Sequence, residues 1–166
     1  MTVMRVERVV YGVPNLDECA RFFTDFGLEP LDGGGSEARF ATQTGQVIEL
    51  RDVDDPSLPP AVQAGPSLRE IVWGVDTQEA LDKLAMNLLS DRSIYTDADG
   101  VAHTVDETGF GVGLAISQPT TGKMNYPGGN RTGNINRWNE PMRHPGRVRP
   151  LRLCHVALDI DRKSVV

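Results

Sequence analysis

Two stretches of the chain share one pattern of hydrophobic and polar positions. The segments VERVVYGVPNLDECARFF at 6–23 and LREIVWGVDTQEALDKLA at 68–85 align without a gap. Each begins with a run rich in β-branched residues, passes through a Gly-Val pair and continues with apolar residues at helical spacing. The pattern predicts a buried strand followed by a helix that packs on a sheet, and it occurs twice.

The ends of the two helices and the strands that follow them can also be predicted. Asn15 and Asp76 are the expected N-caps, each with a glutamate three positions later, as a capping box requires. Gly27 is the expected left-handed residue that ends the first helix. The strands expected after the helices lie around 30–31, at 37–42, 46–50, 93–96, 101–105 and 112–116. Both units therefore have the order β-α-β-β-β, at 1–60 and 61–118.

The stretch LRLCHVALDI at 151–160 matches the opening strands of the two units position for position. It predicts the first strand of a third unit, so residues 151–166 are expected to be the truncated start of a further half. Residues 119–150 are rich in Gly, Pro, Asn and Arg, lack hydrophobic periodicity and are predicted to be a linker. The predicted fold is α+β: two paired modules in 1–118, then the linker and one strand of a third module.

Composition and charge limit the classes of function. The net charge is −6, with 39% hydrophobic and 24% charged residues. Residues 1–118 carry 8 basic and 20 acidic side chains, whereas 119–150 carry 6 basic and 1 acidic. The acidic body argues against nucleic acid as a partner. No apolar run reaches the ~20 residues of a membrane span. Cys19 and Cys154 form no zinc or redox spacing, so a cytoplasmic location is expected.

Tandem β-α-β-β-β modules in which Gly-Val leads into the first helix resemble the vicinal oxygen chelate superfamily. That superfamily includes glyoxalases, bleomycin-resistance proteins, fosfomycin-modifying enzymes and extradiol ring-cleavage dioxygenases. The resemblance covers residues 5–118, and 151–160 as a fragment. A third module after a linker is similar to extradiol dioxygenases of the 2,3-dihydroxybiphenyl type, which carry four modules in two halves. The resemblance implies that the two modules pair into a cup-shaped mixed sheet.

The resemblance also implies where a divalent metal would be bound. In that superfamily the ligands come from the opening and last strands of each module, which here correspond to Arg8, Glu49, Glu70 and Gly113. Arginine is not a metal ligand at ordinary pH, and glycine has no side chain. We therefore predict that Arg8 pairs with Glu49 or Glu70 in place of an ion. No metal or other cofactor is expected to bind this chain.

His155 occupies the position of the first iron ligand in the catalytic half of extradiol enzymes, whose Fe(II) is held by two histidines and one glutamate. The other two ligands would lie in a module that this chain lacks. The resemblance implies a parent enzyme that cleaves an aromatic diol with O2, and an inactive isolated chain. Two alternatives stay open: a metal-free small-ligand binding protein of the bleomycin-resistance type, and a glyoxalase-like lyase. Assembly into a homo-oligomer is a further alternative that stays open.

The remaining histidines are not assigned to a metal site or a catalytic site. His103 alternates with apolar residues along an expected strand and is expected to face solvent. His144 lies among arginines and is expected to belong to the linker. Tyr11 and Trp73 occupy equivalent positions in the two opening strands, and each is expected in the core or in the lining of the cup.

Overall fold

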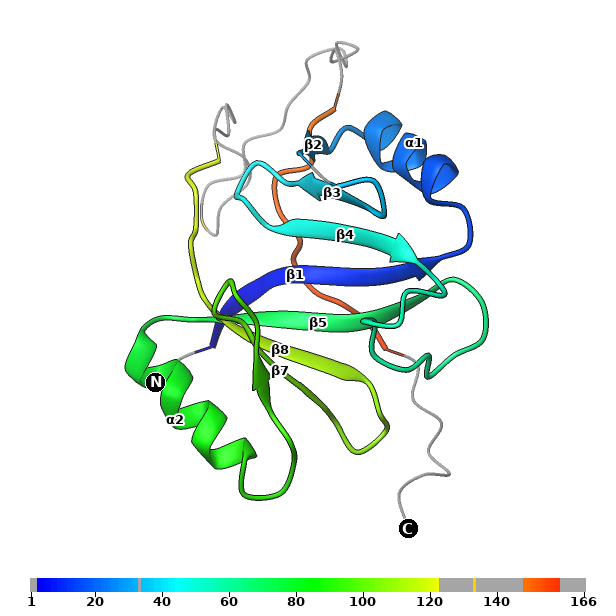
Figure 1. Ribbon diagram of the computed structural model, residues 1–166. Coiled ribbons are helices and arrows are strands. Elements are labelled where there is room, and N and C mark those ends of the chain that lie inside the picture. Colours follow the sequence, from blue (N-terminus) through cyan, green and yellow to red (C-terminus); the bar gives the residue numbers. More distant parts are fainter. Residues whose placement is uncertain (1–2, 33, 123–132, 134–147, 159–166) are drawn as a thin grey trace.

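The computed structural model describes residues 3–32, 34–122, 133 and 148–158. Two copies of one unit form a single sheet with two helices (Figure 1). The first unit comprises β1 (Val3–Val13), α1 (Leu16–Phe26), β2 (Glu29–Leu31), β3 (Glu37–Ala41) and β4 (Val47–Asp52). The second comprises β5 (Ser67–Val75), α2 (Gln78–Leu88), β6 (Tyr95–Thr96), β7 (Ala102–Val105) and β8 (Gly111–Ile116).

The eight strands lie in the order β2-β3-β4-β1-β5-β8-β7-β6. The two opening strands, β1 and β5, pair antiparallel at the centre, and each pairs in parallel with the last strand of its own unit. The outer strands are antiparallel hairpins. The predicted α+β fold of two paired β-α-β-β-β modules in an open mixed sheet is confirmed.

Local sequence explains where the helices begin and end. The Asn15 side chain accepts the backbone N–H of Glu18 at 3.1 Å, which confirms Asn15 as the N-cap. The Glu18 carboxylate accepts from the Asn15 side-chain amide at 3.1 Å, whereas in a capping box it would accept from the backbone N–H of the N-cap residue. Gly27 has φ of 99° and ends α1 in the left-handed conformation, as predicted. The N-cap of α2 is Thr77, so the prediction of Asp76 is wrong by one residue. The Thr77 hydroxyl reaches the N–H of the third helical residue at 3.2 Å.

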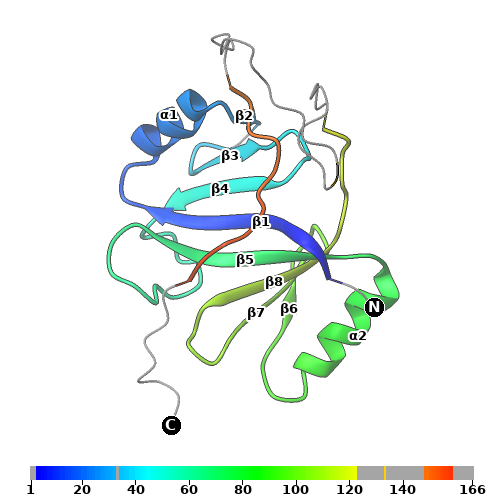
Figure 2. The same ribbon diagram turned by 180° about the vertical axis from the view of Figure 1, so that it is seen from behind.

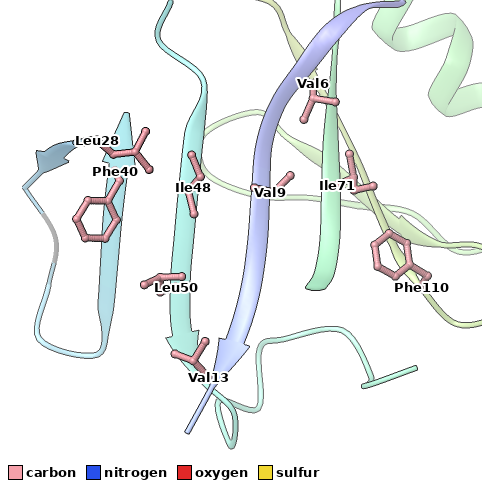
Figure 3. Packing of buried hydrophobic residues seen from close by; sticks show 9 residues of the cluster. All are labelled: Val6, Val9, Val13, Leu28, Phe40, Ile48, Leu50, Ile71 and Phe110. Atoms are coloured by element: carbon pink, nitrogen blue, oxygen red, sulfur yellow. The ribbon is translucent and has the colours of Figure 1, made fainter. Parts of the chain in front are cut away.

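Both helices cover the same face of the sheet, which we call the helix face. The main core lies on this face and is built from residues of β1, β3, β4 and β5, together with Leu28 and Phe110 (Figure 3). Leu50 is fully buried at its centre. The apolar stripe of α1 packs on this core through Leu16, Cys19, Ala20 and Phe23. The stripe of α2 packs on Val75, Ala102 and Leu114 through Ala80, Leu81, Leu84 and Leu88. The opposite face, which neither α1 nor α2 covers, is the cup face.

Residues 148–158 also lie on the helix face, where they cross the sheet from the region of β2 towards β5 (Figure 2). Leu153 and Val156 pack against the main core. The Gln46 side-chain amide accepts the N–H of Leu153 at 2.8 Å and donates to its carbonyl at 2.8 Å. Residues 151–158 form no strand, so that prediction is wrong for the described part of 151–160. The segment crosses the face of the sheet instead of running alongside a strand (Figure 2), and the carbonyls of Pro150 and Leu151 accept the backbone N–H groups of Gln43 and Thr44 in the turn between β3 and β4.

Several predictions from sequence fall on residues whose structure is not described. Most of the predicted linker lies there, at 123–132 and 134–147, as do His144 and residues 159–166. Of the helices that are described, each has 11 residues, and none is long and apolar enough to cross a lipid bilayer.

Candidate functional site

The cup face is defined by the register of the three central strands. Arg8 of β1 lies opposite Val47 of β4 and Val72 of β5. Glu49 is two residues further along β4, and Glu70 two residues before Val72 on β5. Because side chains alternate along a strand, the three charged groups Arg8, Glu49 and Glu70 project from the same face. They are the three charged positions that the resemblance placed in a cup.

Glu49 is the centre of the charged cluster in the first module. Its side chain is 1% exposed and three guanidinium groups surround it. Arg51 donates to one carboxylate oxygen through Nε at 2.6 Å. Arg8 donates to the other oxygen through Nη1 at 3.2 Å, and the Nε of Arg39 lies 3.7 Å from that oxygen. One buried carboxylate is therefore shared by three cations.

Arg51 has further partners that compensate its charge. Its guanidinium lies 4.0 Å from Glu37 and 3.9 Å from Asp55, and it donates to the Ser57 hydroxyl at 2.8 Å. Burial alone lowers the pKa of Arg51, but attraction to Glu49 and the hydrogen bond with it raise the pKa above its ordinary value. Since Arg51 is balanced in this way, the charge of Glu49 is left to compensate Arg8 and Arg39.

The second module carries a different cluster on the same face. His103 of β7 contacts Glu70 through Nδ1 at 2.7 Å and Asp97 through Nε2 at 3.0 Å. The ring of Tyr95 stacks on the imidazole with 4.8 Å between centroids. Burial alone lowers the pKa of His103, but hydrogen bonds to the two carboxylates raise it above the ordinary value. Both ring nitrogens face acceptors, which is the arrangement that an imidazolium requires.

The expectation that His103 faces solvent is wrong, because the residue is only 8% exposed. Its partner Glu70 lies on β5, and β8 runs between the two strands. The residues of β8 beside them are Gly111 and Gly113, which pair with Glu70 and His103 respectively. At Gly111 a Cβ would lie 2.9 Å from the Cβ of Glu70, so this glycine lets β8 run close beside Glu70. The signal in the sequence was GVG at 111–113 next to a strand that contains a histidine.

The residues predicted from the metal positions are thus divided between two clusters. Arg8 contacts Glu49, whereas Glu70 is bound by His103. At Gly113 a Cβ would lie 2.8 Å from the side chain of Val72, so a ligand side chain does not fit there. His155 is exposed on the C-terminal segment. In the described ranges, no group of three or more His, Cys, Asp or Glu side chains is placed to hold a metal ion.

A cavity of about 510 Å³ opens on the cup face beside the first cluster. Arg8 and Arg39 form one part of its wall, and Val47, Val72 and Ala115 form an apolar part. The turn that contains Asp99 forms another side. The volume lies within the range of small-molecule sites in proteins. The cup face therefore offers a charged and apolar hollow in place of a metal centre.

Several solved structures share this fold. The Mn(II)-bound glyoxalase from Novosphingobium aromaticivorans matches with a TM-score of 0.57 and 18% identity, over 75% of this chain and 43% of that chain. The 2,3-dioxygenase LapB from Pseudomonas sp. KL28 matches at 0.58 and 16%, over 71% and 42%. An extradiol ring-cleaving dioxygenase from B. fuscum matches at 0.57 and 15%, over 72% and 34%. No family model and no curated protein sequence matches the chain.

The chain therefore has the fold of glyoxalases and extradiol dioxygenases, which is the vicinal oxygen chelate fold expected from the sequence. It spans between 34% and 43% of the length of the three solved proteins described above. The metal that this fold implies does not fit the cup face of this chain. Glu49 is engaged by guanidinium groups, Glu70 is engaged by His103, and the remaining two positions are an arginine and a glycine.

Proposed function

We propose that residues 1–118 form the non-catalytic half of an Fe(II)-dependent extradiol dioxygenase that cleaves catechol-type aromatics with O2. The catalytic half would hold the iron, and His155 would be one of its ligands. In this role the two described modules are a scaffold, and this chain alone is expected to be inactive. Arg8 would take the place of a metal ion by compensating Glu49.

The contact between Arg8 and Glu49 carries the proposal. The Arg8 guanidinium lies 3.2 Å from a carboxylate that is 1% exposed, and in the proposed role it would take the place of the cation that related proteins bind. The likeness in fold to several dioxygenases, each about two to three times longer than the matched part, supports a role as one half of a larger enzyme. A glyoxalase-like lyase is disfavoured because it requires ligands at all four metal positions.

Metal retention and ring cleavage test the proposal directly. The full chain is dialysed anaerobically against Fe(II), or against Mn(II), and retained metal is measured by mass spectrometry. Catechol and air are then added. We expect far less than one metal per chain and no yellow ring-fission product. One retained metal per chain, or a yellow product, would contradict the proposed scaffold role.

A pair of variants controls for non-specific binding. Arg8→His places an imidazole beside Glu49 on the cup face, and Arg92→His places one between Asp91 and Glu107 on the exposed surface. If position 8 corresponds to a ligand position, Arg8→His retains more Mn(II) than Arg92→His. Equal retention by the two variants would mean that Arg8 does not occupy such a position.

A second candidate function is metal-free binding of a small ligand, and the cavity of about 510 Å³ on the cup face favours it. This role needs no catalytic half. Thermal-shift measurements with catechols and planar aromatic compounds, with and without metal, distinguish the candidates. Stabilisation by a compound without metal supports the binding role, and stabilisation that requires metal contradicts it.

A further inference from the structure

We infer that the cavity on the cup face binds a small carboxylate with an apolar body, held by Arg8 and Arg39. This inference deepens the second candidate function by naming the class of ligand, and it does not rest on the dioxygenase proposal. It follows from the unused donors of the two guanidinium groups, from the charges around them and from the shape of the wall.

The two arginines have donors that the protein does not use. The Nε atoms of Arg8 and Arg39 are buried and have no hydrogen-bond partner among the described residues. Arg8 is 12% exposed and donates to Glu49 at 3.2 Å, and Arg39 approaches the same oxygen no closer than 3.7 Å. Because these two Nε atoms are buried, a ligand in the cavity does not reach them, and the donors left for it are the other N–H groups of the two guanidiniums. An acceptor that enters the cavity beside these side chains can bond to their outer N–H groups.

The charges around the cavity favour an anion. Glu37 and Asp55 balance the charge of Arg51, whereas Arg8 and Arg39 both face the single carboxylate of Glu49, so the wall beside these two arginines carries excess positive charge. Two acidic residues also line the cavity. Glu7 is already engaged, because Arg5 donates two hydrogen bonds to it at 2.6 and 2.8 Å. The Ser117 hydroxyl donates to Glu7 as well.

The second acidic residue of the lining, Asp99, lies on the turn at 97–100, where its side chain is exposed to water. A charge in this position is screened by solvent and salt, whereas the buried guanidinium of Arg8 is screened much less. The net electrostatic effect inside the cavity is therefore attraction of an anion to the wall formed by the two arginines.

The shape of the wall selects among anions. A guanidinium presents parallel N–H groups that match the two oxygens of a carboxylate. Val47, Val72 and Ala115 line the cavity beside the arginines and offer apolar contact to the body of such a ligand. A fully hydrated inorganic anion gains nothing from these three side chains. A carboxylate joined to an aromatic ring or a short aliphatic chain fits both parts of the wall.

Benzoate titration of the full chain at low ionic strength tests the inference, with binding followed by calorimetry and by amide NMR shifts. The neutral analogue benzamide has the same shape and serves as the first control. We expect saturable binding of benzoate, with benzamide weaker by about tenfold or more, because a charge-assisted hydrogen bond is about twice as strong as a neutral one. Equal affinity for the two compounds, or no saturable binding at millimolar benzoate, would overturn the inference.

Two arginine variants locate the site. Arg39→Gln removes one cationic wall residue whose side chain is 32% exposed, and Arg21→Gln removes the same charge from the exposed surface of α1. Benzoate affinity should fall about tenfold or more in Arg39→Gln and stay unchanged in Arg21→Gln. Equal affinities of the two variants would place the anion elsewhere. Tighter binding of inorganic phosphate than of benzoate would refute the carboxylate class.

The outcomes separate this inference from the dioxygenase proposal. Retention of iron in the dialysis experiment would contradict the scaffold role without changing the benzoate result. Conversely, failure of benzoate to bind would leave the metal measurements unaffected.

Discussion

Replacing Glu49 with Gln removes the one charge that three guanidinium groups share. Gln has nearly the same size as Glu, so the substitution leaves no void beside the sheet. The side chain is 1% exposed, and it accepts hydrogen bonds or ion pairs from Arg8, Arg39 and Arg51. Breaking a buried ion pair by removing one partner costs about 3–5 kcal/mol, because the opposite charge stays buried and uncompensated. We expect Glu49→Gln to lose that much unfolding free energy.

A neighbouring carboxylate provides the matched control. Glu37 lies 4.0 Å from Arg51, and its side chain is 30% exposed. Exposed ion pairs contribute about 0–1 kcal/mol, so Glu37→Gln should differ little from the parent chain. Urea unfolding followed by circular dichroism measures both variants. A loss below about 1 kcal/mol in Glu49→Gln, or equal losses in the two variants, would show that the buried carboxylate does not stabilise the cluster, contrary to the magnitudes used here.

Two other perturbations test the second cluster and the C-terminal segment. Since the pKa of His103 is raised in the folded state, its stabilising contribution is complete below the ordinary value of about 6.5 and is lost as pH rises through the folded-state pKa. Urea unfolding should therefore show a fall in stability above about pH 6.5 that His103→Gln lacks, and equal pH profiles would refute this. Gln46→Leu should speed tryptic cleavage after Arg152, because unpairing the groups that Gln46 binds costs about 1–3 kcal/mol. Gln43→Leu, which removes one exposed hydrogen bond to the same segment, should change the rate less, and an equal effect would contradict the role of Gln46.

Much of the fold could be predicted from sequence because its signals are local and occur twice. The Gly-Val pairs, the apolar stripes and the αL residue at Gly27 each set one feature within a few residues of the chain. The duplicated pattern then required two equivalent modules, and two such modules pair through their opening strands. The error at the start of α2 also concerns neighbouring residues. Asp76 and Thr77 are both favourable N-cap residues, and only the backbone conformation decides which of them caps the helix.

The site was harder to predict because its contacts join distant strands. The expected set contained Arg8, Glu49 and Glu70, and the structure places all three on one face. The set did not contain His103. The alternation of residues along its short strand does not show which side chains of other segments lie next to it. The contact with Glu70 reaches across β8, where Gly111 pairs with Glu70 and Gly113 pairs with His103, so three strands have to be placed before the contact can be recognised.

Residues 151–158 show a different reason for failure. Their apolar pattern matches β1 and β5, and a strand was therefore expected. A strand also needs a partner edge, and the short β2 and β6 occupy the two edges of the sheet. The side chains of Leu153 and Val156 are partly buried against the core, Cys154 and His155 between them are exposed, and the Gln46 side chain binds the backbone of Leu153. The pattern predicted contact with the core at two positions, but neither the burial nor the hydrogen bonding of a strand.

The two modules carry clusters of opposite net charge on the cup face. In the first module Glu37 and Asp55 balance Arg51, and two guanidiniums, Arg8 and Arg39, face the one carboxylate of Glu49, which leaves an excess of positive charge beside the cavity. In the second, the single imidazole of His103 lies between two carboxylates, which leaves an excess of negative charge. A ligand that lies across both modules therefore meets a fixed electrostatic gradient. Its carboxylate would be drawn to the first module and repelled by the second, so the cup defines an orientation as well as a position.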